Sequence, residues 1–188
     1  TNAFSSIDSA VAAANSGDTI RVLSGVYTAA STINKTNIQL LGGTPSTLGD
    51  FSGIDKSTID GRDSSRDPAT SVREALIING GSVTVTASGV TVAGFTFRDN
   101  SSGAPLSITA SGSTIKNNVY TGNVYGLDIS GNNADVQKNY FVQNNSAGTN
   151  RSQGINVNGG ATGATIHDNT LLTHNNANAT RPAGIVVQ

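Results

Sequence analysis

Apolar residues spaced two positions apart recur along the chain, in short segments that end at glycine or asparagine. Ile20 and Val22 flank the polar Arg21, and the same alternation returns in segments 37–43 and 57–61. A period of two between apolar residues is typical of a β-strand that buries one face. The pattern therefore predicts many short strands joined by tight turns.

One segment near the N-terminus has helical spacing instead. Its apolar residues recur at the three- and four-residue spacing of one helix face, at Phe4, Ile7, Ala10, Val11 and Ala14. Ser5 or Ser6 could cap the start of this helix, and Gly17 stands just past its end. The spacing predicts a helix over residues 6–15, which would cover the end of an apolar interior.

The strands belong to an internal repeat. Residues 83–92 align without a gap with residues 106–115. Extending the alignment gives four columns of equivalent residues: Val92, Ile115, Val136 and Ile166; Phe95, Asn118, Asn139 and Asn169; Phe97, Tyr120, Phe141 and Leu171; and Asn100, Asn123, Asn144 and His174. A further strand recurs at 106–108, 127–129, 155–157 and 185–187, so each repeat holds three short strands.

A repeat of this size cannot bury its apolar face alone, whereas stacked repeats can. We therefore predict an all-β fold, a parallel β-helix solenoid of about seven coils with three short strands per coil. Successive coils would pair in parallel about 4.8 Å apart. The whole chain forms one domain in this interpretation, with a helical cap at 1–17 and coils over 18–188. The register of residues 43–82 stays unassigned.

Two columns of the repeat have a structural interpretation. The aromatic column of Phe97, Tyr120 and Phe141 is expected to pack inward. The column of Asn118, Asn139 and Asn169 is expected to lie at a bend. There an asparagine can adopt left-handed backbone angles, and stacked amides can hydrogen-bond along the axis.

The composition of the chain excludes several classes of protein and of binding site. Charged residues are 12% of the chain and the formal net charge is −1, a balance that fits neither a charged disordered tail nor a nucleic-acid partner. The chain has no cysteine, which excludes a disulfide framework and a cysteine–zinc site. No run of about 18 apolar residues exists, so we expect no membrane insertion. No signal peptide is visible; we expect that one was removed and that the protein is extracellular or on the cell surface.

One outward face of the predicted coils carries candidate catalytic residues. Lys116, Lys138 and His167 are expected on neighbouring coils beside Asp135 and Asp168. A lysine or histidine with a lowered pKa could abstract a proton there. Paired acids such as Asp135 and Asp168 could instead serve a hydrolase. The alternative is an ordinary solvated face with weak charge pairs.

Two insertions of equal length, 144–154 and 174–184, predict neighbouring loops. Arg151 and Arg181 each precede the next inward isoleucine by the same interval and are expected one coil apart. Together with amides such as Asn145 and Asn176, they could hold a carboxylate or sulfate of a glycan. The alternative is a repeated loop with a solvent-facing arginine.

The sequence indicates no firm cofactor, with calcium as an open alternative. Asp60, Asp63 and Asp67 lie in a charged stretch and could supply oxygen ligands, but pairing with nearby arginines is the favoured alternative. Five Asn-x-Ser/Thr sequons are present, at Asn34, Asn100, Asn144, Asn150 and Asn178.

The segment from Ser6 to Tyr27, with its short helix, its 17–20 Gly-Asp-Thr-Ile and its 25–27 Gly-Val-Tyr, resembles the opening of right-handed parallel β-helix proteins. These include chondroitinase-B-like and alginate-lyase-like polysaccharide lyases and secreted or surface β-helix proteins. Segments 37–42, 58–61 and 90–97 continue the resemblance. It implies a right-handed solenoid. For a lyase it would also imply a Lys, Arg or His base, often with a calcium that neutralises a uronate carboxylate.

Two functions follow as hypotheses. The first is a non-catalytic secreted or cell-surface domain, adhesive, structural or glycan-binding, with a polysaccharide or surface glycan as its partner. An open last coil at 185–188 would allow end-to-end self-association, or continuation in a longer protein. The alternative is a calcium-assisted lyase that cleaves uronic-acid-containing glycans by β-elimination. The pI of about 6.0 disfavours the alternative, because a polyuronate cleft should be basic.

Overall fold

The computed structural model describes residues 3–23, 25–42, 75–78, 81–101, 103–142, 144, 151–172 and 181–188. Side chains are described in these ranges except at 25, 75–78, 151, 152, 181 and 182.

The described strands form three sheets of six strands each. Sheet A consists of β1 (Thr19–Val22), β4 (Gln39–Gly42), β7 (Thr91–Ala93), β10 (Thr114–Lys116), β13 (Asp135–Gln137) and β16 (Thr165–His167). Sheet B consists of β2 (Gly25–Tyr27), β5 (Ala75–Ile78), β8 (Phe95–Arg98), β11 (Val119–Thr121), β14 (Tyr140–Val142) and β17 (Thr170–Leu172). Sheet C consists of β3 (Ser31–Ile33), β6 (Val83–Val85), β9 (Leu106–Ile108), β12 (Tyr125–Ile129), β15 (Arg151–Val157) and β18 (Arg181–Val187).

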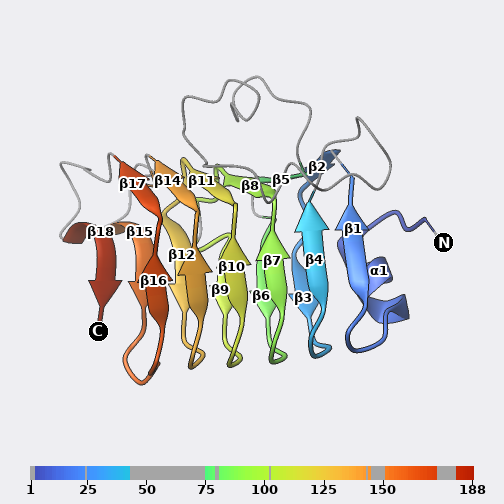
Figure 1. Cartoon of the computed structure of the whole chain (residues 1–188). Helices are drawn as coiled ribbons and strands as arrows, with labels where there is room; N and C mark the ends of the chain where they lie inside the picture. Colours follow the sequence, from blue (N-terminus) through green and yellow to red (C-terminus); the bar gives the residue numbers. More distant parts are fainter. Residues whose placement is uncertain are drawn as a thin grey trace.

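Three consecutive strands, one from each sheet, make up what we call a tier. Tiers stack along one axis, with sheet A in front, sheet B at the top and sheet C behind in Figure 1. Pairing within each sheet is parallel, and Ile115 pairs with Val92 on one side and Val136 on the other. The repeat alignment is thereby confirmed, and the architecture is compatible with a β-helix solenoid. The described strands make six tiers; a total of about seven coils and the right-handed winding stay predictions.

The predicted N-terminal helix is confirmed as α1 (Ile7–Ala13), slightly shorter than expected. The Ser6 side chain caps it by accepting the Ser9 N–H at 3.1 Å. Ile7 and Val11 are buried in the same core as the first tier, and α1 contacts β1 and β3. The helix therefore covers the first tier, as its apolar stripe predicts.

The interior holds a stack of aromatic rings over three successive tiers. The ring centroids of Phe97 and Tyr120 lie 5.0 Å apart and those of Tyr120 and Phe141 lie 4.4 Å apart. The rings of each pair are stacked and nearly parallel, with interplanar angles of 11° and 4°. All three side chains are fully buried, so the predicted inward packing of this column is confirmed.

Buried asparagines join the tiers where sheet A ends and sheet B begins. Asn118 N–H donates to Asn139 Oδ1 at 3.0 Å, and Asn139 N–H donates to Asn169 Oδ1 at 2.9 Å. The Asn139 amide also donates to Ile115 O at 2.8 Å. We call this column the first asparagine ladder. The amide hydrogen bonds predicted along the axis are confirmed.

The left-handed backbone angles predicted for these asparagines are wrong, because the left-handed residue stands one position before the ladder. Asn117, Lys138 and Asp168 have φ of 55°, 54° and 55°, and Gly94 has φ of 80° at the same corner. The left-handed residue turns the chain. The ladder asparagine that follows is thereby aimed inward, where its amide bonds to the backbone of the neighbouring tiers.

A second asparagine ladder, made of Asn100, Asn123 and Asn144, joins neighbouring tiers at the corner where sheet B ends and sheet C begins. Asn100 N–H donates to Asn123 Oδ1 at 3.0 Å, and Asn123 Nδ2 donates to Asn144 Oδ1 at 2.9 Å. All three residues are buried. Each ladder satisfies backbone groups at a corner, where no strand can pair with them.

We predict that Asn139→Ala lowers the free energy of unfolding by about 3 kcal/mol or more, because it leaves the buried Asn118 N–H and the Ile115 carbonyl without partners. Chemical denaturation followed by circular dichroism measures the change. The matched control is Asn132→Ala, which removes an exposed amide that accepts the Thr162 N–H at 2.9 Å; its cost should stay below about 1 kcal/mol. Equal costs for the two variants would contradict the structural role of the ladder.

Candidate functional site

The outward face of sheet A carries two columns of side chains, because alternate residues of each strand face away from the core. One column follows the register Thr91, Thr114, Asp135 and Thr165, and the other follows Ala93, Lys116, Gln137 and His167. Buried Val92, Ile115 and Val136 lie between them. This face holds most of the predicted catalytic residues.

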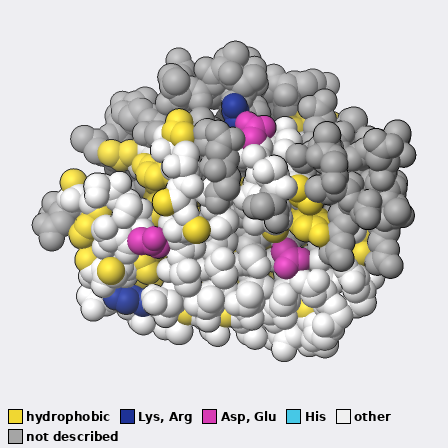
Figure 2. All heavy atoms as spheres, turned by 180° about the vertical axis from the view of Figure 1, so that it is seen from behind, with side chains coloured by type: hydrophobic (Ala, Val, Ile, Leu, Met, Phe, Trp, Pro, Cys, Tyr) yellow, Lys and Arg dark blue, Asp and Glu magenta, His cyan; other side chains and the backbone are white. Residues whose placement is uncertain are grey.

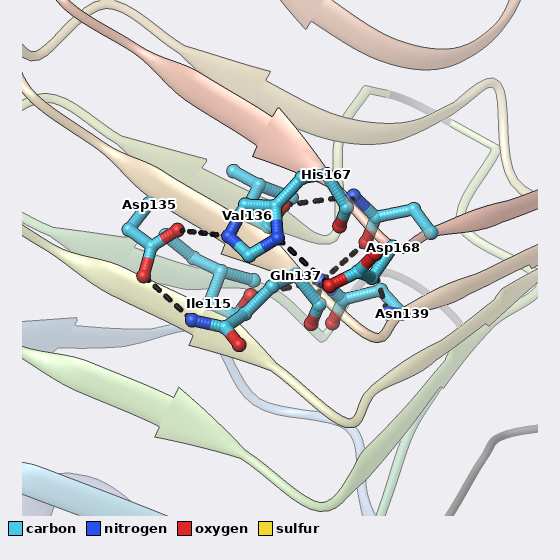
Figure 3. Close-up of polar contacts among 8 residues, drawn as sticks. Ile115, Asp135, Val136, Gln137, Asn139, His167 and Asp168 are labelled. Atoms are coloured by element: carbon cyan, nitrogen blue, oxygen red, sulfur yellow. Dashed lines mark hydrogen bonds and ion pairs between the residues drawn. The ribbon is translucent and has the colours of Figure 1, made fainter.

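At the C-terminal end of this face, His167 lies between two carboxylates (Figure 3). Its Nε2 is 3.2 Å from Asp135 Oδ1, and its Nδ1 is 3.0 Å from Asp168 Oδ2. Gln137 Nε2 donates to the other Asp135 oxygen at 2.7 Å. Asp135 belongs to β13, whereas His167 and Asp168 belong to the next tier. The cluster therefore links two tiers at the surface.

This arrangement favours the imidazolium. The hydrogen bond with Asp168 is the largest cause that raises the pKa of His167 above its ordinary value of 6.5, and the bond and charge of Asp135 act in the same direction. Only the doubly protonated ring can donate to both carboxylates. A general base at neutral pH needs a free, unprotonated nitrogen, and both nitrogens of His167 are engaged by carboxylates.

The lysines lie elsewhere on this side of the molecule. Lys116 is in β10 and pairs in register with Gln137, so a full tier separates it from His167. Lys138 is exposed and occupies the left-handed corner after β13. The structure thus brings His167 together with Asp135 and Asp168, and it does not add a lysine to the cluster.

The two aspartates both bond to the same imidazole, and their role as the acid pair of a hydrolase stays a prediction. Sequence reasoning placed Asp135, His167 and Asp168 on one face but missed the bridge between them. The signal was present: His167 precedes Asp168 directly and shares a column with Gln137, beside Asp135.

The predicted arginine pair is in register at the level of the backbone. Arg151 and Arg181 are Cα partners in β15 and β18, which confirms that they lie one tier apart. Their side chains lie outside the described part, as do Asn145 and Asn176. Their role in glycan binding stays a prediction.

The calcium candidates Asp60, Asp63 and Asp67 also lie outside the described residues. Within the described ranges, no group of three or more His, Cys, Asp or Glu side chains could hold a metal ion. The calcium hypothesis for residues 60–67 therefore stays untested. No helix described here is both long and apolar enough to cross a membrane.

Burial of the asparagine side chain excludes glycosylation at two of the five sequons in the folded protein. Asn100 and Asn144 are 2% and 0% exposed, and the Asn144 amide nitrogen donates to Tyr120 O at 3.0 Å. Both belong to the second ladder, so neither amide is accessible for glycosylation in the folded protein. Asn34 is exposed, and Asn150 and Asn178 lie outside the described residues.

The outward face of sheet C carries a polar network that the sequence analysis did not identify. Asp128 Oδ1 accepts the amide nitrogens of Asn156 at 2.6 Å and Asn158 at 3.0 Å. The Asn158 amide also donates to Ser130 Oγ at 3.0 Å, and Gln188 Nε2 donates to Asn156 Oδ1 at 2.9 Å. The network spans the last three tiers. Its only sequence signal is the polar residue between apolar neighbours in each strand.

No protein-family model, curated protein or solved structure matches the chain. The resemblance of residues 6–27 to β-helix polysaccharide lyases therefore stays a proposal.

We predict that His167 titrates above pH 6.5 in the folded protein. Its bonds to two carboxylates therefore stabilise the fold below pH 6.5, and this contribution is lost as pH rises through the folded pKa. Proton NMR of the imidazole measures the pKa, and His167→Gln assigns the resonance against that of His174. Asp168→Asn and Asp135→Asn should each lower the pKa, because both carboxylates raise it. A pKa at or below 6.5 in the wild type would contradict the bridged geometry.

Proposed function

We propose that the chain is a non-catalytic, secreted or cell-surface β-helix domain that binds a polysaccharide or surface glycan, as an adhesive or structural segment. The observation that carries the proposal is the state of His167. It is the one histidine of the described part, and carboxylates occupy both of its nitrogens. With both nitrogens bonded to carboxylates, His167 has no free nitrogen with which to abstract a proton, which favours a non-catalytic domain.

The surface chemistry supports glycan binding. The side seen in Figure 2 has few charged side chains in its described part, and neutral polar groups and backbone predominate there. Sugars present hydroxyl groups, which such a surface can meet with hydrogen bonds. The tiers hold these groups on a rigid scaffold, which lowers the entropy cost of binding an extended ligand.

The predicted arginine pair would supply an ionic contact within this function. The Cα pairing of Arg151 with Arg181 puts two cationic residues on adjacent tiers. An arginine pair at this spacing suits a carboxylate or sulfate on the glycan. This contact would add affinity for acidic glycans. It does not require calcium, whether or not Asp60, Asp63 and Asp67 bind that ion.

The proposed winding is right-handed. Each strand connects to the next strand of its own sheet through the two other sheets, so every tier is a crossover between parallel strands. Such crossovers are right-handed in nearly all proteins. The resemblance of residues 6–27 to right-handed β-helix proteins points the same way.

We predict binding without cleavage. When the protein is incubated with polyuronates and sulfated glycosaminoglycans, with and without calcium, the ultraviolet absorbance of the unsaturated product should stay flat. Retention of at least one neutral or acidic glycan on immobilised protein should be measurable. A rise in absorbance that His167→Ala or Lys116→Ala abolishes would establish the alternative, a polysaccharide lyase. Absence of both activities would contradict the proposed function.

Self-association through the last tier is a second prediction. Ile185 and Val187 are 43% and 74% exposed, although their register partners Ile155 and Val157 are buried. Light scattering over a concentration series should reveal a dimer, because two copies can cover these core-facing side chains together. Val187→Lys should shift the protein to monomer. The control Val26→Lys, at a side chain 59% exposed in β2, should not. A wild-type monomer at every concentration would contradict this prediction.

A further inference from the structure

Eight polar side chains form a regular array on the outward face of sheet C. The register aligns one column of Thr84, Ser107, Asp128 and Asn156. Thr86, Thr109, Ser130 and Asn158 form a second column, since the N–H of each donates to a carbonyl of the preceding tier at the equivalent position. We call these eight residues the sheet C stripe. Their neighbours along the strands, such as Val85 and Ile108, are buried.

The array has fixed spacings in two directions. Neighbouring tiers lie about 4.8 Å apart, and residues two apart along a strand lie about 6.8 Å apart. The flanking core residues hold each strand rigidly. The stripe therefore presents polar groups at set intervals along the axis, which suits an extended, repeating ligand.

The side-chain donors of the stripe are largely used within the protein. Thr86 Oγ1 donates to Ile33 O at 3.3 Å, and Thr109 Oγ1 donates to Val85 O at 3.0 Å. The Asn158 amide donates to both oxygens of Asp128 and to Ser130 Oγ. These bonds fix the orientation of the side chains before any ligand arrives.

The acceptor oxygens of the stripe, in contrast, can accept further hydrogen bonds from the solvent side. A threonine hydroxyl has two lone pairs besides the hydrogen that it donates, and a carboxylate has about four acceptor positions. Thr86, Thr109 and Ser130 are exposed, and Asp128 is half-buried. Because the exposed hydroxyls of Thr86 and Thr109 already donate within the protein, they offer acceptors, which favours a ligand that brings its own donors.

We propose that the sheet C stripe binds an uncharged glycan segment, whose hydroxyl groups donate to Thr86, Thr109 and the Asp128 network. This inference rests on the proposed glycan-binding function and adds the binding face and the ligand class. The carboxylate of Asp128 disfavours an acidic sugar at this position, because like charges repel. The arginine pair at the start of β15 and β18 would be a separate, charge-dependent contact.

Calorimetric titration with cellohexaose, mannohexaose and hexameric N-acetylchitooligosaccharide tests the proposal. At least one of these uncharged probes should bind the wild type. Thr109→Val and Thr86→Val each keep the shape of the side chain but remove its oxygen. Each should weaken binding by about three- to tenfold, the worth of one hydrogen bond. Thr114→Val is the matched control on sheet A and should leave the affinity unchanged.

Charge and salt supply a second readout. Asp128→Asn should weaken binding of the same probe, whereas Asp135→Asn on sheet A should not. Affinity for an uncharged probe should also be insensitive to salt between 50 mM and 500 mM, because screening acts on charged pairs (about 10 Å Debye length at 0.1 M). Thermal melts of all variants verify that each one is folded.

Three results overturn the inference in different ways. Binding restricted to acidic glycans, weakened by salt and abolished by Arg151→Ala with Arg181→Ala, would assign recognition to the arginine pair; the proposed function would then stand and the stripe would fail. If the protein binds no glycan, charged or uncharged, both the proposed function and the assignment of the stripe are wrong. Equal affinity of Thr109→Val, Thr86→Val and the wild type for a bound neutral probe would also overturn the stripe.

Discussion

The structure depends on satisfying the backbone groups at corners that a stack of parallel-stranded tiers has to bury. Strands pair with the tiers on either side, but each corner interrupts this pairing and leaves N–H and C=O groups inside. The two asparagine ladders solve the problem with one side chain per tier. Asn118 and Asn139 show how: each amide bonds to backbone of the neighbouring tiers while staying inside the core. The left-handed residue before each of them makes this orientation accessible.

Because of this construction, inward and outward positions differ in the residue types that the fold requires. Inward positions need apolar, aromatic or ladder residues, as the stack from Phe97 to Phe141 illustrates. Outward positions are constrained little by folding, because their backbone pairs within the sheet whatever the side chain. The face of sheet A and the stripe of sheet C are therefore free to carry recognition chemistry, on a scaffold that stays the same from tier to tier.

The repeat made most of the fold predictable from sequence. Equivalent residues such as Ile115 and Val136 stand in register as the alignment requires, and the helix near Ile7 was visible from its spacing. The left-handed corner was misplaced by one residue, because each ladder position holds an asparagine, a type that tolerates positive φ, whereas the corner position holds Lys138 in one tier. The bridge through His167 was missed for another reason: it depends on rotamers and on contact between tiers, which column positions do not specify. The network around Asp128 was missed for the same reason.

The most direct test of the account maps a bound glycan on the folded protein. In a ¹⁵N-labelled sample, an oligosaccharide that binds should shift the amide resonances of the outward positions of sheet C, with Thr86, Thr109 and Ser130 among them. The saccharide's own spectrum should stay unchanged over days, as expected for a non-catalytic domain. Shifts centred on His167 and Asp135, with new signals from an unsaturated sugar, would contradict the account and identify the face of sheet A as an active site.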